Sequence, residues 1–175
     1  MARPTISPTG VERTFDEDQI IVSKTDTKGI LTYTNRLFLD IAGYKEDEVL
    51  GQPHNMIRHP DMPRCIFELL WKTISQEKEI FAYVMNMAKN GDHYWVLAHV
   101  TPILDKNKSV LGYHSSRRVP ESRVMPTIKK LYADLLQLEK SHSGSPKEAL
   151  AASMNAIDNL LKEKGVSYDE FIHNL

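Results

Sequence analysis

Two long β-type segments joined by an Asn-Gly turn constrain the fold of this 175-residue chain more than any other feature. The segments are EIFAYVMNMA (79–88) and HYWVLAHVTPIL (93–104), separated by KNGD. Asn-Gly between β-branched and aromatic runs is the strongest short-range signal for a β-hairpin. The stretch SVLGYHSSRRV (109–119) predicts one more strand. Three antiparallel strands are therefore expected between residues 79 and 119.

A second hairpin and short helices are expected before this unit. The segments 19–26 and 30–35 read as two strands around a turn, and residues 36–44 have apolar side chains at helical spacing. Residues 63–76 predict an amphipathic helix, with Asp61 as its N-cap and an apolar stripe of Phe67, Leu70, Trp71 and Ile74. This order predicts an α+β fold, a five-stranded antiparallel sheet with short helices on one face.

The remainder of the chain reads as a helical extension. Residues 121–140 carry an a/d-type apolar repeat of about two heptads. Two capping boxes, beginning at Ser145 and Ser167, predict two further helices. The apolar repeat predicts either a homodimer through 121–140 or packing within the chain, and the sequence leaves both open. The expected organisation is an N-terminal extension (1–15), a central domain (16–120) and C-terminal helices (121–175).

Composition and charge exclude several functional classes. A net charge of −1, from 22 basic and 23 acidic side chains, offers no basic footprint for nucleic acid. The single cysteine excludes an intrachain disulfide and favours a reducing compartment. There is no signal-peptide pattern, and no apolar stretch approaches the roughly 20 residues that span a bilayer. We expect a cytoplasmic protein without direct membrane insertion. It is not expected to be an enzyme, because no Gly-rich phosphate loop, nucleophile elbow or HExxH motif occurs.

Side-chain alternation in the long hairpin predicts a pocket wall. Alternate residues of a strand share a face, which places four small, branched or amide side chains together on the first strand: Ile80, Ala82, Val84 and Asn86. The segment NMIRHPDMP (55–63) is expected at the mouth of a cavity between this wall and the Trp71 helix. Such a cavity suits a flat conjugated cofactor, with Asn86 at its polar edge and Arg58 near any charge it acquires. Simpler roles stay open: Asp61 as a plain N-cap, Arg58–Asp61 as a surface ion pair, and Trp71 as a core residue.

One longer motif carries a family resemblance. The run GQPHNMIRHPDMP (51–63), the following Trp71 helix and KNGDHYWV (89–96) resemble the PAS domain of bacterial energy-taxis receptors of the Aer type, over about residues 16–119. The resemblance implies a PAS fold that binds FAD noncovalently and reports redox state. It also implies the cofactor-binding residues Asn35, Arg58, His59, Asp61, Trp71 and Asn86.

The chain departs from the Aer pattern at several points. Ile80 stands where a tryptophan is usual, and NMAKNGD replaces a basic NRRKNGD. The NCRFLQ motif of the LOV photoreceptors is absent, and Cys65 lies beyond the RHPD run, so no light-driven cysteinyl adduct is expected. The chain also lacks the HAMP and methyl-accepting coiled coil of Aer. It is similar in this respect to the CetB kind, a free-standing PAS protein serving a membrane chemoreceptor-like transducer or another signalling protein.

Two alternatives to FAD stay open at this point. One is a haem b gas or redox sensor with His59, or else another of the seven histidines, as axial ligand, since PAS domains take both cofactors. The other is a cofactor-free PAS dimerisation module. A metal site is not expected, because His54 and His59 are five residues apart and His93 and His99 suit exposed strand positions.

Overall fold

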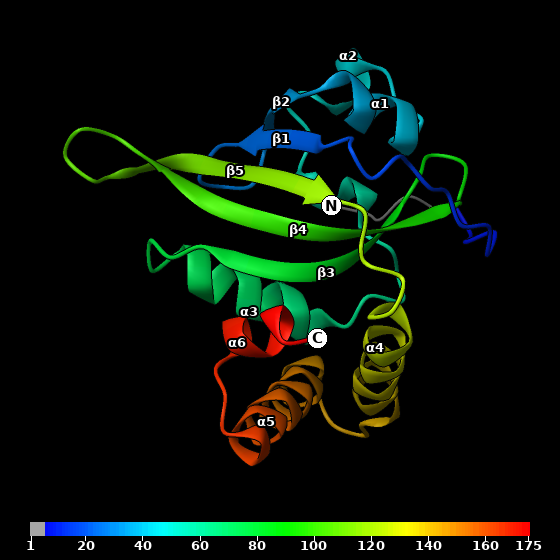
Figure 1. Ribbon diagram of the computed structural model, residues 1–175, viewed down its shortest axis with the longest axis vertical. Coiled ribbons are helices and arrows are strands. Elements are labelled where there is room, and N and C mark those ends of the chain that lie inside the picture. Colours follow the sequence, from blue (N-terminus) through cyan, green and yellow to red (C-terminus); the bar gives the residue numbers. More distant parts are fainter. Residues whose placement is uncertain (1–5) are drawn as a thin grey trace.

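The computed structural model describes residues 6–175, and its centre is a five-stranded antiparallel sheet in the order β2-β1-β5-β4-β3 (Figure 1). The strands are β1 (Ile21–Thr25), β2 (Leu31–Thr34), β3 (Ile80–Met87), β4 (His93–Leu104) and β5 (Val110–Arg118). Every neighbouring pair in this order is antiparallel. The five predicted strands and the α+β class are therefore confirmed.

Four short helical elements lie between β2 and β3. They are α1 (Arg36–Ala42), α2 (Glu46–Val49), the 3-10 turn η1 (His54–Ile57) and α3 (Arg64–Ile74). Asn35 begins α1: its side-chain oxygen accepts a hydrogen bond from the backbone N–H of Phe38. Gly43 ends α1 in the left-handed conformation, with φ of 72°, where glycine carries no steric penalty.

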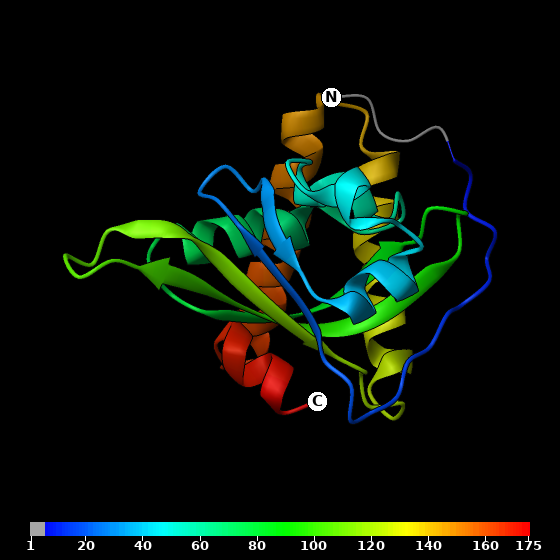
Figure 2. The ribbon, with the colours of Figure 1, turned by 90° about the horizontal axis from the view of Figure 1, so that it is seen from above.

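The register of β3 and β4 gives the sheet two different faces. Val84 pairs with Val96 and Asn86 with Tyr94, so the predicted set of alternating residues shares one face, which we call the inner face. Figure 2 shows α3 on one side of the sheet and α6 (Tyr168–His173) on the other. The inner face thus lies under α3, and the opposite, outer face carries side chains such as Tyr83 and Trp95.

The outer face is partly covered by the C-terminal helices α4 (Met125–Ser141), α5 (Pro146–Lys164) and α6. Tyr132 of α4 lies against Trp95, and its hydroxyl donates to the backbone oxygen of Tyr83 at 2.7 Å. The repeat predicted in 121–140 is buried within the chain at Val124, Ile128 and Leu135, whereas its other members, Leu131 and Leu138, are half-buried. The structure therefore shows the second of the two expectations for this repeat, packing within the chain. A homodimer through 121–140 stays a prediction.

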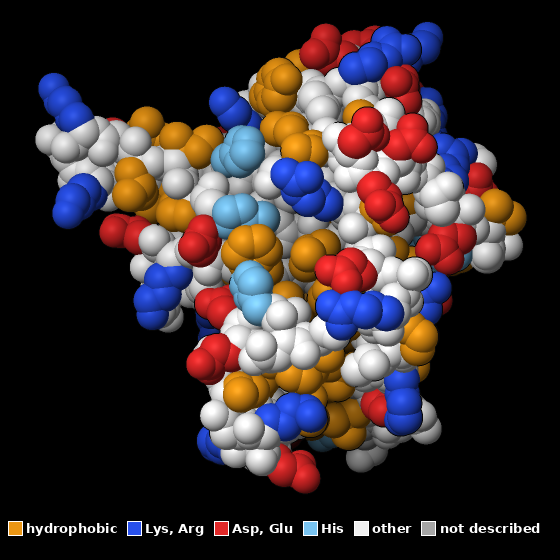
Figure 3. Space-filling model, in the orientation of Figure 1, with side chains coloured by type: hydrophobic (Ala, Val, Ile, Leu, Met, Phe, Trp, Pro, Cys, Tyr) orange, Lys and Arg blue, Asp and Glu red, His pale blue; other side chains and the backbone are white. Residues whose placement is uncertain are grey.

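Part of the outer face is left open beside α6. Phe81 stacks on His99, with ring centroids 4.1 Å apart, and His173 of α6 meets Phe81 edge-on at 4.7 Å. Figure 3 shows histidine and hydrophobic side chains side by side on the surface of this view. The helical extension therefore covers the sheet incompletely.

The first turn of α3 is capped from a distant part of the chain. Asp61 was expected to cap it, and this prediction is wrong: the side chain of Asp61 forms an ion pair with Lys140 at 3.0 Å. The two carboxylate oxygens of Glu139 accept from the backbone N–H groups of Arg64 (2.9 Å) and Cys65 (3.0 Å). Ser153 of α5 donates to the same carboxylate at 2.8 Å. The last turn of α4 thus supplies the anion that the start of α3 needs.

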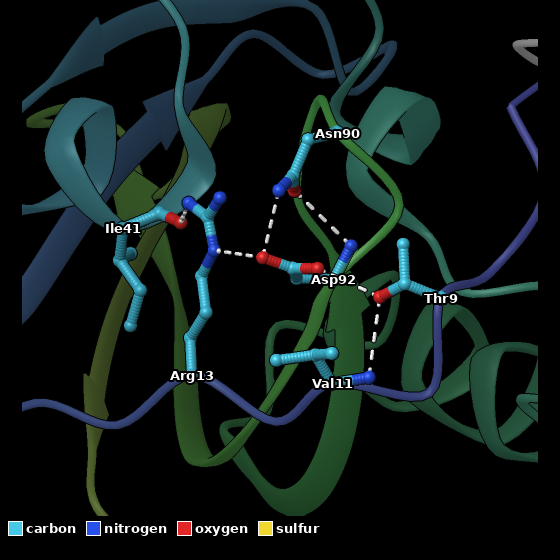
Figure 4. A network of polar contacts seen from close by, with 6 residues as sticks. All are labelled: Thr9, Val11, Arg13, Ile41, Asn90 and Asp92. Carbon is cyan, nitrogen blue, oxygen red and sulfur yellow. Dashed lines mark hydrogen bonds and ion pairs between the residues drawn. The ribbon is translucent and has the colours of Figure 1, made fainter.

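The N-terminal segment is fixed to the turn between β3 and β4 (Figure 4). Asp92 accepts hydrogen bonds from the Thr9 hydroxyl, the Asn90 amide and the Arg13 guanidinium, which together lower the pKa of Asp92 to about 2. Arg13 also donates to the backbone oxygen of Ile41 at 2.8 Å. A Cβ at Gly91 would lie 2.4 Å from the backbone oxygen of Ser7, so only glycine permits this approach. Of the N-terminal extension predicted over residues 1–15, residues 1–5 lie outside the described residues, and Thr9 and Arg13 are held by these contacts.

Replacing Glu139 by alanine tests the capping interaction. Two backbone N–H groups of α3 would lose their charged acceptor, so the free energy of unfolding should fall by about 2 kcal/mol. Denaturant unfolding measures this change. Glu163→Ala, on the exposed surface of α5, is the matched control and should leave the free energy within about 0.5 kcal/mol of the parent. Equal effects of the two substitutions would contradict the capping role.

Candidate functional site

A cavity of about 170 Å³ lies between the inner face of the sheet and α3. Its walls are mostly apolar, and the side chains of α3 that face it are Phe67, Leu70, Trp71 and Ile74. These are the four residues of the stripe that the sequence placed on this helix. Val84, Ala98 and Val100 of β3 and β4 form the opposite wall. Of the pocket wall predicted from side-chain alternation on β3, Val84 and Asn86 line the cavity, whereas Ile80 and Ala82 do not.

Trp71 lies at the opening of this cavity. It is 41% exposed although it belongs to the apolar stripe. Its ring meets Tyr113 of β5 edge-on, with centroids 5.6 Å apart. Gly29 lies against the same ring, because a Cβ there would come within 3.1 Å of Trp71. Trp71 thus borders the cavity instead of filling it.

The floor of the cavity carries three buried polar groups without a hydrogen-bond partner among the described residues. They are Nδ2 of Asn86, Oγ of Ser115 and Nη1 of Arg117. All three residues line the cavity, and their exposed fractions are 3%, 8% and 3%. Buried polar groups of folded proteins are nearly always hydrogen-bonded, so three together indicate a place that a polar ligand would complete.

Arg117 has neutral partners at its other nitrogen. Nη2 of Arg117 donates to Oγ of Ser23 at 2.8 Å and to Nε2 of His54 at 2.5 Å. Burial, and next the positive charge of Arg117, lowers the pKa of His54 to about 3. The imidazole is therefore neutral at physiological pH, with Nε2 as the acceptor and the proton on Nδ1. Burial also lowers the pKa of Arg117, but only to about 10, so the guanidinium keeps its charge.

Arg58, Trp71 and Asn86 are the predicted site residues that the structure brings together. All three line the cavity. The backbone of Arg58 forms an antiparallel bridge with that of Asn86, which places the 53–58 segment against β3. The guanidinium of Arg58 lies over the ring of Phe67, 4.1 Å from its centroid, and donates to the backbone oxygen of Met62 at 3.4 Å.

Asn35, His59 and Asp61 do not line this cavity. The amide of Asn35 binds backbone groups: it accepts from Val22 and donates to Ile20 as well as capping α1. His59 is buried and its Nδ1 accepts from the backbone N–H of Asp61 at 3.1 Å. Burial is the main reason that the pKa of His59 is lowered. Asn35 thus joins β1 to the start of α1, and His59 and Asp61 stabilise the 58–63 loop.

Four polar residues of the cavity have no counterpart in the sequence-based prediction. Ser23, His54, Ser115 and Arg117 lie on three separate segments. Alternation within β5 puts Ser115 and Arg117 on one face, which is the only local signal that they act together. Which face that is depends on the pairing of Ser115 with Val100 and of Arg117 with Ala98.

Other chemistry in the described residues is limited. Cys65 is buried outside the cavity, and burial raises the pKa of its thiol to about 12, so it stays protonated. Within residues 6–175, no three His, Cys, Asp or Glu side chains are grouped so as to hold a metal ion. The helices of this same range include none with the length and apolar character needed to cross a membrane.

Comparison with known proteins identifies the class. Residues 31–117 match the family model of the PAS fold. The light-state structure of the LOV domain of the blue-light photoreceptor Aureochrome1 superposes with a TM-score of 0.56 at 18% identity, covering 65% of this chain and 91% of that one. The chain therefore contains a PAS domain.

Within this class the chain is similar to bacterial sensory proteins. It is 38% identical to the aerotaxis receptor of Escherichia coli over 119 residues, which make up 68% of this chain and 23% of the receptor. It is 25% identical to blue-light-activated histidine kinase 1 of Erythrobacter litoralis over 150 residues, 83% of this chain and 39% of the kinase. The chain thus spans well under half the length of either relative.

The neutral state of His54 predicts a pH effect on stability. Its pKa in the folded protein lies below the value of about 6.5 in an unfolded chain, so the unfolded state binds the extra proton between about pH 6.5 and 3. The free energy of unfolding should therefore fall as the pH falls through this window. NMR titration of the His54 ring and denaturant unfolding at pH 7 and 5 measure both effects.

His54→Asn is the matched variant for this measurement. It keeps an oxygen acceptor for Arg117 but has no ionisable ring, so it should lose less stability between pH 7 and pH 5 than the parent. A His54 resonance that titrates near pH 6.5 would contradict a neutral imidazole that accepts from Arg117.

Proposed function

We propose that the cavity binds FAD noncovalently and that the protein is a cytoplasmic redox sensor which reports to a signalling partner. The observation that carries this proposal is the combination of apolar walls with three unpartnered polar groups on one side. A flat ring system with one polar edge needs these two kinds of surface together. When bound, the flavin exchanges electrons, and its charge and hydrogen-bonding pattern change with its redox state.

The residues of the cavity fit a flavin ring. Asn86 offers both a donor and an acceptor, and Ser115 a hydroxyl that can act as either. Arg117 and Arg58 supply positive charge near the polar side. The α3 stripe and the β3–β4 wall would exclude water from the faces of the ring. Because Cys65 is buried and protonated away from the cavity, binding without a covalent bond is the form that these residues support.

The relatives support a flavin in this position. The resemblance to Aer-type domains, now accompanied by 38% identity to the aerotaxis receptor, is the reason for proposing FAD and redox sensing. The structural neighbours include LOV domains, one of them studied with a flavin analogue. The preference for FAD over FMN rests on the Aer resemblance alone.

The contacts around Arg58 suggest how a change in the cavity could reach the surface. Arg58 contacts the backbone of Met62, and Sδ of Met62 accepts from the backbone N–H of Met85. The same loop is tied to α4 through the Asp61–Lys140 ion pair and the Glu139 cap of α3. We propose that α4 and α5 respond to the redox state and contact a membrane chemoreceptor-like transducer or another signalling protein. Such coupling requires that the two redox states favour different positions of these helices.

The haem alternative has less support from the cavity. Its expected axial ligand, His59, does not line the cavity, and its Nδ1 is engaged by the backbone of Asp61. His54, which does line the cavity, already accepts from Arg117 through Nε2. A haem protein would show a Soret band in place of flavin absorption, so one spectrum separates the two cofactors.

Protein purified from a flavin-replete host should be yellow, with flavin absorption and FAD released on denaturation. Val84→Phe would fill part of the cavity and should reduce flavin content at least about tenfold, because packed interiors do not accommodate extra volume beside a ligand. Leu111→Phe, on an exposed position of β5, is the matched control and should retain flavin.

The proposal fails if the purified parent contains no flavin and binds none when FAD is added. A colourless protein whose signalling is unaffected by Val84→Phe would instead support the cofactor-free PAS module. Circular dichroism of each variant establishes that a loss of colour is not a loss of folding.

A further inference from the structure

Arg117 is a buried cation without a counterion. It lies near the end of β5, the central strand of the sheet, is 3% exposed, and its cross-strand neighbours are Ile21 of β1 and Ala98 of β4. Both directly paired residues are apolar, and the polar partner that the neighbouring strand β1 offers is the hydroxyl of Ser23. Its carbon also lies 5.8 Å from the centroid of the Phe38 ring. Arg117 thus combines nearly complete burial with apolar neighbours on the adjacent strands and on α1.

No carboxylate neutralises this charge among the described residues. None of the ion pairs within residues 6–175 includes Arg117. Its hydrogen-bond acceptors are the Ser23 hydroxyl and the neutral imidazole of His54. A charge that is buried without an opposite charge is costly to a folded protein. The fold therefore keeps Arg117 at the expense of its own stability.

The unpartnered side of Arg117 belongs to the cavity. Among residues 6–175, Nη1 has no hydrogen-bond partner, and Arg117 lines the cavity together with Asn86 and Ser115, whose unpartnered atoms form the rest of its polar floor. In this low-dielectric position a negative charge on a ligand would interact far more strongly with Arg117 than with a cation at the surface.

We propose that Arg117 is the residue by which the cavity recognises negative charge on its ligand, and that it makes the site prefer the anionic form of that ligand. This inference rests on the proposed function. It means that the site binds FAD more tightly when the flavin ring is reduced and anionic than when the ring is oxidised and neutral. Asn86 and Ser115 orient the ring, and Arg117 discriminates between its redox states. Arg58 is partly exposed and stacked on Phe67, so it contributes less to this discrimination.

Substitution of Arg117 by methionine separates this role from a structural one. Methionine fills similar space without charge, and Ser23 can still hydrogen-bond His54, because their side chains lie 3.3 Å apart. Replacing an unpaired buried charge by an apolar residue leaves a protein equally or more stable. We therefore expect the flavin-free Arg117→Met protein to resist denaturant at least as well as the parent.

The same variant should lose the preference for the reduced ligand. We expect the ratio of the FAD dissociation constants, oxidised over reduced, to fall about tenfold or more, which is a drop of about 30 mV or more in the two-electron midpoint potential. Arg117→Lys keeps the charge and should retain most of the ratio. Arg118→Met is the matched control: Arg118 is the next residue of β5, is exposed, and should leave the ratio unchanged.

A second measurement uses the flavin-free protein and the anionic aromatic probe 8-anilinonaphthalene-1-sulfonate. The probe should fluoresce when it binds the parent protein. This fluorescence should be weaker with the Arg117→Met protein and unchanged with the Arg118→Met protein. An unchanged dissociation-constant ratio in Arg117→Met overturns this inference while the flavin proposal stands. A parent without flavin overturns the proposed function, and the probe then decides whether Arg117 still recognises an anion. Loss of stability in Arg117→Met would show a structural role and also overturn the inference.

Discussion

Strict alternation of side chains along β3, β4 and β5 is the constraint on which the rest of this structure depends. One set of alternate residues, including Val84, Asn86 and Ala98, faces α3 and forms the cavity. The other set, including Tyr83 and Trp95, lies beneath or beside the C-terminal helices. A shift of one residue in the pairing of β3 with β4 would exchange the two sets. The cavity and the surface for α4 are therefore fixed by the same register.

The cavity itself combines two requirements that oppose each other. Its apolar walls favour a closed, well-packed core, whereas Asn86, Ser115 and Arg117 bring polar atoms into that core without satisfying them. A protein under selection for stability alone would replace such groups, since each one lowers the free energy of unfolding. Sites that bind ligands retain them because the ligand supplies the missing partners. The polar floor is thus better explained by binding than by folding.

The sequence predicted those parts of the fold that depend on local patterns. The Asn-Gly hairpin, the α3 stripe, and the capping boxes at Ser145 and Ser167 are all present, because each is specified within a few neighbouring residues. Of the predicted site residues, Arg58, Trp71 and Asn86 reach the cavity.

Features that join distant segments could not be predicted in the same way. The Glu139 cap of α3 and the Arg13–Asp92 ion pair are two such features. Neither can be recognised from neighbouring residues in the sequence, because the residues of each pair meet only in the folded protein. Arg117 illustrates the limit most clearly. Alternation groups it with Ser115, but the pairing of β5 with β4 decides that this group faces the cavity.

The carboxylate that begins α3 comes from a residue 75 positions later in the chain, and this has a consequence for biosynthesis. A chain emerging from the ribosome would display β1 to β5 before Glu139 has been made, so the start of α3 would lack its charged acceptor until α4 follows. The same dependence bears on protein engineering. A sensor unit transplanted from this chain would be more stable with α4 attached, because a cassette ending after β5 would leave the start of α3 without its anion.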